Sequence, residues 1–340
     1  MKGNYPSILS LADEVERQEQ AKEDYRLSTN SLTFHGNGRI EIAGEGDHGV
    51  NDSFHQGVAA KYKIPIKYYR RLQEYPEFLG EHLNSWFHKE PTNRTVRTLD
   101  GNARAFLSDH FQPFDNHDMI SAAMPVLTQT DLQVKSATLT DERMYVQLVF
   151  PKLTGEVKQG DPVQFGITIR NSEVGKGSVS IEAFIYRLIC SNGMVGQSLM
   201  KKYHVGRGLT DGWDIYTKDT IAANINAFKM SLRDVLNDAI NGRGFQDTLA
   251  QLQGTVEQDM HDPLKSVEKV TKRFQLTNEE HDQTLRNLLE NADTTNRWGL
   301  ANAITALAHD TDEPDRQYDL ERFGSQIITL ADKDWEELAA

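Results

Sequence analysis

The chain has 340 residues, of which 38 % are hydrophobic and 26 % charged, and its formal net charge is −13. This length suffices for a sizeable apolar core and is typical of about two domains. The single cysteine, Cys190, excludes a disulfide framework and any multi-cysteine metal site. The longest apolar runs, such as 327–331, are far shorter than the roughly 18 residues of a membrane span. Acidic residues follow the N-terminus where a secretory signal would be apolar, so we expect a cytoplasmic protein without a membrane partner.

The first part of the chain is predicted to be mainly helical, with one hairpin. Its elements are a polar helix over 12–22, a hairpin over 31–42, a glycine-rich acidic loop over 44–49, and helices over 53–62, from Pro65 and over 77–87. The hairpin is indicated by glycines in its turn, and the helix over 53–62 by Asp52 or Ser53 as its N-cap.

The middle of the chain is predicted to form a sheet. Strands over 95–99 and 103–107 flank the dipeptide Asp100-Gly101, which is a strong hairpin turn. After a helix over 115–127, apolar residues alternate through much of 132–190, which indicates strand after strand. Beyond Phe184 both faces become apolar, as in a central strand that is covered on both sides.

The last part of the chain is predicted to be helical and acidic. Residues 209–340 carry 13 basic and 25 acidic side chains. Apolar residues recur there at helical spacing, most regularly from Ile221 to Leu236. Further helices are expected over 264–274, 278–291, 297–309 and 320–330.

These patterns predict an α+β fold in which a mostly antiparallel, curved sheet with packed helices is followed by an acidic helical C-terminal region. The predicted units are a polar leader and hairpin over 1–50, an α+β core domain over 51–208, and the acidic helical region over 209–340.

Two basic islands interrupt the acidic chain. Residues 61–110 carry 9 basic and 6 acidic side chains, and residues 166–208 carry 6 and 2. In the first island, the candidate phosphate-binding residues are Arg94, Arg97 and Arg104, and the candidate stacking residues are Tyr68, Tyr69 and Phe106. Cations that follow phosphates beside rings that stack on bases are typical of a single-stranded nucleic-acid groove. The alternative is an exposed helix whose tyrosines lie half in the core.

The second island has further candidates for binding an anion. Lys176 lies in a glycine-containing segment, 171–178, that forms either a phosphate cradle or a long hairpin loop. Period two places Arg187 on an otherwise apolar strand face, where a guanidinium needs a ligand or a carboxylate such as Glu182 or Glu173. The glycine-flanked stretch after it contributes Lys201, Lys202, His204 and Arg207.

The sequence shows no pattern of catalytic or metal-binding residues. Its histidines are scattered, and no P-loop or paired-histidine helix occurs. Cys190 ends an apolar strand, as a buried core thiol does. We therefore predict no catalytic residue, no metal site and no cofactor, and an enzyme is the less expected class.

Several motifs resemble a family of phage- and plasmid-like proteins, domain of unknown function 932. They are 97–109 (RTLDGNARAFLSD), 160–163 (GDPV), 166–178 (GITIRNSEVGKGS), 187–194 (RLICSNGM), 204–206 (HVG) and 296–305 (NRWGLANAIT). The resemblance covers roughly residues 54–310. It implies a mobile-element setting and supplies no catalytic residues.

We therefore predict a nucleic-acid-binding accessory protein of a phage or plasmid that acts in replication or recombination, by annealing or protecting single strands. We also expect a homo-oligomer. One alternative is an enzyme or sensor for a small phosphorylated ligand, held by Lys176, Arg187 and the loop over 201–207. Another is an oligomeric protein that blocks host defence through protein contacts.

Overall fold

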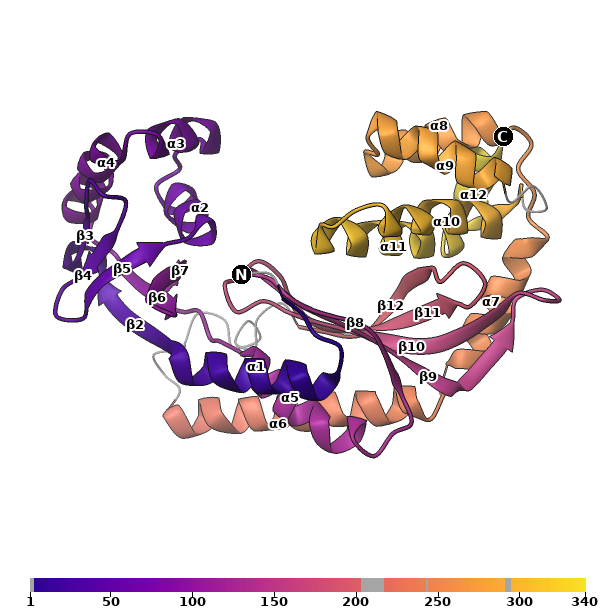
Figure 1. Ribbon diagram of the computed structural model, residues 1–340, viewed down its shortest axis with the longest axis horizontal. Helices are drawn as coiled ribbons and strands as arrows, with labels where there is room; N and C mark the ends of the chain where they lie inside the picture. Colours follow the sequence, from indigo (N-terminus) through magenta and orange to yellow (C-terminus); the bar gives the residue numbers. More distant parts are fainter. Residues whose placement is uncertain (1–2, 203–216, 243, 291–294) are drawn as a thin grey trace.

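The computed structural model of the chain describes residues 3–202, 217–242, 244–290 and 295–340 (Figure 1). Two six-stranded, mostly antiparallel sheets are followed by a helical C-terminal region. The predicted α+β fold class is thereby confirmed. Within the described ranges, every helix is too short or too polar to span a lipid bilayer.

The N-terminal lobe is built on the first sheet, whose strands run in the order β2-β6-β7-β5-β4-β3. These strands are β2 (Lys22–Ser28), β3 (Leu32–Phe34), β4 (Ile40–Ile42), β5 (Gly46–Val50), β6 (Asn93–Leu99) and β7 (Asn102–Ser108). Helices α2 (Asp52–Lys61), α3 (Ile66–Gln73) and α4 (Pro76–Lys89) complete the lobe. The predicted turn joins β6 to β7, with positive φ at Asp100 (50°) and Gly101 (73°). The predicted acidic loop is instead largely β5, because it pairs with both β4 and β7.

The second sheet, which we call the central sheet, is antiparallel throughout and has the order β1-β8-β9-β10-β11-β12. Its strands are β1 (Gly3–Asn4), β8 (Gln133–Leu139), β9 (Met144–Glu156), β10 (Pro162–Asn171), β11 (Val179–Arg187) and β12 (Gly193–Lys202). Strand β12 lies beyond the predicted end of the sheet at 190. Glycines at 193 and 196 interrupt its apolar pattern, which weakens the strand signal.

Helices cover both faces of the central sheet (Figure 1). On one side lie α1 (Ile8–Ala21), α5 (Asn116–Leu127), α6 (Lys218–Ile240) and α7 (Phe245–Val256). The C-terminal helices are α8 (Pro263–Phe274), α9 (Asn278–Glu290), α10 (Arg297–Thr305), α11 (Pro314–Ile328) and α12 (Asp332–Ala339). Helices α7 and α12 were not predicted, and α11 begins six residues earlier than expected.

Two main apolar cores hold the molecule together. The smaller core lies in the N-terminal lobe and includes Phe54, Leu83 and Val96. The larger core runs from Ile8 on α1 through the central sheet to Ala339 on α12. The N-terminal leader and the C-terminal helices therefore pack on the same sheet.

Candidate functional site

A buried ion-pair cluster joins the N-terminal lobe to the central sheet. Arg97 on β6 is fully buried, and its Nη1 and Nη2 donate to the two Asp115 carboxylate oxygens at 2.8 and 2.9 Å. Its Nε donates to Asp24 at 2.8 Å, and Nη1 also donates to the carbonyl oxygen of Glu173 at 2.8 Å. Burial alone would raise the pKa of Asp115, but Arg97 and Lys22 outweigh it and lower the pKa to about 2.

Arg104 and Arg94 are the other two candidate arginines of the first island. Arg104 on β7 is buried, and its Nη1 lies 2.7 Å from Glu173 Oε2. Its Nε and Nη2 have no hydrogen-bond partner within the described ranges. The guanidinium of Arg94 lies 5.7 Å from the centre of the Phe106 ring. The first basic island is therefore partly interior, and Arg97 and Arg104 connect the N-terminal lobe to Asp115 and Glu173.

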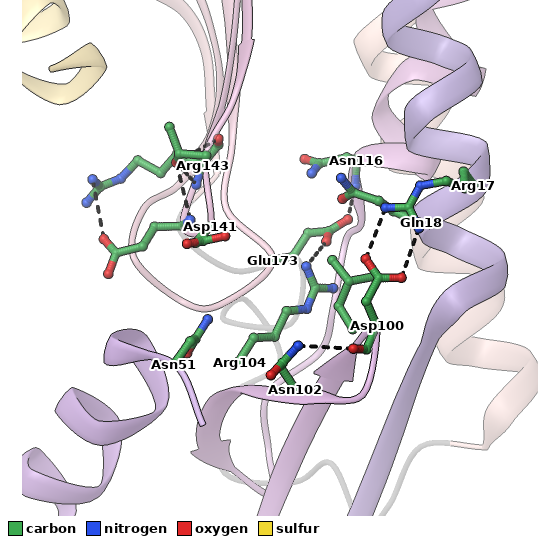
Figure 2. A pocket seen from close by; sticks show the side chains of 13 residues that line it. Arg17, Gln18, Asn51, Asp100, Asn102, Arg104, Asn116, Asp141, Arg143 and Glu173 are labelled. Atoms are coloured by element: carbon green, nitrogen blue, oxygen red, sulfur yellow. Dashed lines mark hydrogen bonds and ion pairs between the residues drawn. The ribbon is translucent and has the colours of Figure 1, made fainter. Parts of the chain in front are cut away.

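A polar pocket of about 280 Å³ opens beside this cluster, where the β6–β7 turn, α1 and the β8–β9 turn meet (Figure 2). We call it the junction pocket. Figure 2 shows Arg17 paired with Asp100 and Arg104 paired with Glu173, and it shows Arg143 on the opposite wall. Arg143 in turn pairs with Asp315. Because Arg17, Arg104 and Arg143 are paired with carboxylates, the described lining of this pocket offers a phosphate no unpaired positive charge.

The three candidate stacking residues lie in different surroundings. Tyr69 is fully buried, and its hydroxyl lies 3.0 Å from His55 Nδ1. Phe106 is 4 % exposed and packs edge-on against Phe54. Neither ring presents a face to a base in this structure, because both belong to the core of the N-terminal lobe. Tyr68, by contrast, is 47 % exposed, so the stacking prediction is kept for Tyr68 alone.

The exposed residues around Tyr68 form what we call the α3 surface. It consists of Lys67, Tyr68, Arg70, Arg71, Tyr75 and Phe78, all of which are exposed. Figure 1 shows α3 at the top of the N-terminal lobe, away from α1. Among the residues that the structure describes, no ion pair involves its three cations. This surface therefore combines free positive charges with accessible aromatic rings.

The candidates of the second island are divided between the two ends of the central sheet. Arg187 lies at one end of β11 and donates to both carboxylate oxygens of Asp161, at 2.6 and 2.8 Å. Trp298 Nε1 donates to the same carboxylate at 2.9 Å. Arg187 thus forms a structural ion pair, with Asp161 in place of the predicted Glu182 or Glu173. Cys190 beside it is half-buried.

Lys176 lies at the opposite end of β11, in the turn next to the N-terminal lobe, and its Nζ donates to Gln56. The backbone of Lys201 and Lys202 pairs with Ser180 and Val179, which places these two positions near the same turn. His204 and Arg207 lie outside the described residues. The fold consequently brings Lys176 toward Arg104 and separates it from Arg187 by the length of a strand.

A second pocket, which the sequence analysis missed, lies between the central sheet and α11. We call it the α11 pocket; its volume is about 220 Å³. Its lining includes the rings of Tyr145 and Phe184 on the sheet and Tyr318 on α11, together with polar residues such as Glu321. The polar residues that alternate with the apolar ones in 145–186 were the available signal. Their partner on α11 follows more than 130 residues later, so no local pattern joins them.

Comparison with protein families gives one match. The model of a family described as a domain of unknown function matches residues 105–322, which is more than half of the chain. The chain belongs to this family, DUF932. The predicted resemblance is thereby confirmed.

No curated protein and no solved structure matches the chain. The DUF932 region includes the whole α11 pocket and excludes the α3 surface. Within the described ranges, no group of histidine, cysteine or acidic side chains could hold a metal ion.

Proposed function

We propose that this DUF932 chain is a non-catalytic protein that binds single-stranded nucleic acid on its α3 surface. The observation that carries the proposal is that exposed rings lie beside cations that form no ion pair with any described residue. Replication or recombination of a phage or plasmid is the setting we propose, and it rests on the resemblance of the sequence motifs alone.

The charge of the surface supports a polyanionic ligand. Residues 61–75 contain five lysines and arginines and one glutamate, in a chain whose net charge is −13. A local positive field of this kind attracts phosphates even on an acidic protein, which at the same time repels nucleic acid elsewhere. Binding should therefore be confined to this face.

The rings supply the second part of the interaction. Tyr68 lies on the same short helix as the cations, and the exposed rings of Tyr75 and Phe78 lie 6.1 Å apart. Bases stack on such rings without regard to sequence, whereas a duplex keeps its bases stacked on one another. The surface therefore favours single strands over duplexes.

Fluorescence anisotropy with labelled single-stranded DNA of increasing length tests the proposal. We expect affinity to increase with length and to decrease with salt. Arg70→Glu/Arg71→Glu should weaken binding and make the plot of log affinity against log salt less steep by about 1.4, because each phosphate contact contributes about 0.7. Tyr68→Ala should weaken binding by roughly 5- to 150-fold, the value of one stacked base.

The matched control is Lys272→Glu/Arg273→Glu on α8. These residues are also an adjacent, exposed basic pair in the last turn of a helix, so the change in net charge is the same. We expect this variant to bind like the wild type. Equal weakening by both double variants, or no binding at low salt, would contradict the proposal.

The other two predicted functions have weaker geometric support. A phosphate pocket built from both Lys176 and Arg187 conflicts with their positions at opposite ends of β11. The exposed rings of the α3 surface also suit a contact between copies of the chain. If the α3 variants changed the mass in solution and left strand affinity unchanged, the surface would be an oligomer contact.

A further inference from the structure

The two faces of the central sheet differ sharply in polarity. On β10, the side chains of Val163, Phe165 and Ile167 face the larger apolar core. The residues between them face the opposite side, where Gln147 and Glu182, the cross-strand neighbours of Thr168, bond to Glu321 and Tyr318 of α11. A sheet face that packs on a helix is normally apolar, and a polar face is normally left to water. A covered polar face therefore requires a further explanation.

Several polar atoms on this face remain unsatisfied. Gln164 Oε1, Thr168 Oγ1, Arg170 Nε and Ser180 Oγ are buried and have no hydrogen-bond partner among the described residues. Burying such groups without partners costs free energy. The interface between α11 and the sheet is thus not optimised for packing alone.

The α11 pocket opens at this interface and contains both aromatic rings and polar side chains. Its cavity of about 220 Å³ is several times the roughly 30 Å³ that one water molecule occupies in the liquid. Tyr145 and Tyr318 lie 5.8 Å apart between ring centres, and Phe184 and Tyr186 lie 6.3 Å apart. Aromatic walls of this kind hold planar groups by stacking.

Glu321, which lines the pocket, supplies an unused hydrogen-bond acceptor. Ser136 Oγ donates to Gln147 Oε1 at 2.9 Å, which orients the amide so that Gln147 Nε2 donates to Glu321 Oε2 at 2.5 Å. Glu321 Oε1 has no hydrogen bond within the described ranges, and it is not among the fully enclosed unpaired atoms, so it is open to the pocket although the side chain as a whole is only 8 % exposed. Gly193 leaves the space for this oxygen, since a Cβ there would lie 2.6 Å from it.

No cation of the described chain pairs with Glu321, and its burial raises the pKa to about 7. A carboxylate that is buried without a cation or a full set of donors is costly. A ligand that donates hydrogen bonds to Oε1 would remove this cost. The chemistry of the site therefore calls for a donor group on a planar body.

We propose that the α11 pocket binds a single guanine-type nucleobase, whose ring lies among the tyrosines and whose N–H edge donates to Glu321. The choice of this ligand class rests on the proposed function. A neutral ring fits better than an organic cation. Lys135 Nζ already lies 4.0 Å from the centre of the Tyr186 ring, and the Arg170 guanidinium lies 4.1 Å from that of Tyr318. These two positive charges would repel a cationic ligand but not a neutral base.

Binding of free nucleosides to the full chain tests the inference without involving the α3 surface. Isothermal titration calorimetry at pH 8 compares guanosine with 1-methylguanosine, which keeps the ring but lacks the N1–H donor. We expect guanosine to bind at least about tenfold more tightly, as for the loss of a hydrogen bond to a charged group. Equal affinities for the two nucleosides would overturn the inference, and this comparison requires no variant.

The variant Glu321→Gln gives a second test of the inference. It should lose most of the preference for guanosine, whereas Glu279→Gln, at an exposed position on α9, should keep it. Circular dichroism establishes that both variants are folded. A Glu321→Gln protein that is folded and still prefers guanosine would overturn the proposal.

The outcome is separable from that of the proposed function. If single strands bind the α3 surface and nucleosides do not bind, the base pocket alone is refuted. If guanosine binds and single strands do not, the α11 pocket is a nucleoside site and the proposed function fails.

Discussion

Glu321 should make the stability of the protein depend on pH in an unusual direction. Its ordinary pKa of 4.5 is raised to about 7 by burial in the folded chain. Between these two values the folded state binds more protons than the unfolded state, so the free energy of unfolding falls as the pH rises. Each pKa unit corresponds to 1.36 kcal/mol. The free energy of unfolding should therefore fall by about 3 kcal/mol in total as the pH rises from below the lower pKa to above the higher one.

Replacing Glu321 with glutamine removes this titration and keeps an acceptor for Gln147. We follow urea unfolding by circular dichroism and compare the free energies of unfolding of the two proteins. Between pH 5 and pH 8, we expect the free energy of unfolding of the variant to rise relative to that of the wild type by about 2 to 3 kcal/mol. Glu279→Gln is the control, because it removes an exposed carboxylate and should follow the wild type. Parallel pH profiles for the wild type and Glu321→Gln would refute the reasoning.

Two further predictions concern stability and use the same unfolding assay. Asp115→Ala should lower the free energy of unfolding by about 3 to 5 kcal/mol, because it leaves the buried Arg97 guanidinium without its main partner; a loss below about 1 kcal/mol would contradict the assigned role. Gly166→Ala should destabilise by about 1 to 3 kcal/mol or more, since a Cβ there would lie 1.9 Å from the Leu148 carbonyl oxygen. Gly254→Ala on α7, where a Cβ meets nothing within 4 Å, should instead stabilise by up to about 1 kcal/mol, and equal effects of the two changes would refute the argument.

The contact between the N-terminal lobe and the central sheet shows what can be predicted from residue type alone. Arg97 and Arg104 were identified from the sequence as a pair beside the Asp100-Gly101 hairpin, and the structure places both near that hairpin. Their exposure could not be predicted, because they are buried by pairing with Asp115 and Glu173, which lie in later segments of the chain. Arg97 and Arg104 are buried because Asp115 and Glu173 pair with them from other parts of the chain.

Tyr68 and Tyr69 show the same limit at neighbouring positions. Both were candidates for stacking, and adjacent residues on a helix point about 100° apart. Which of the two turns inward was decided by His55 and the rest of the N-terminal core, to which the Tyr69 hydroxyl is hydrogen-bonded.

The sequence by itself determined the local features of this protein: the hairpin at Asp100-Gly101, the alternation of apolar residues along β9 to β11, and the amphipathic face of α6. Such features depend on turn conformations and on side-chain periods of 2 and 3.6, which a short stretch of residues expresses in full. Only the tertiary structure decided which charges are paired and that Glu321 meets Gln147 across 174 residues of chain. These choices depend on long-range packing, because the desolvation that perturbs a carboxylate exists only after distant elements have come together.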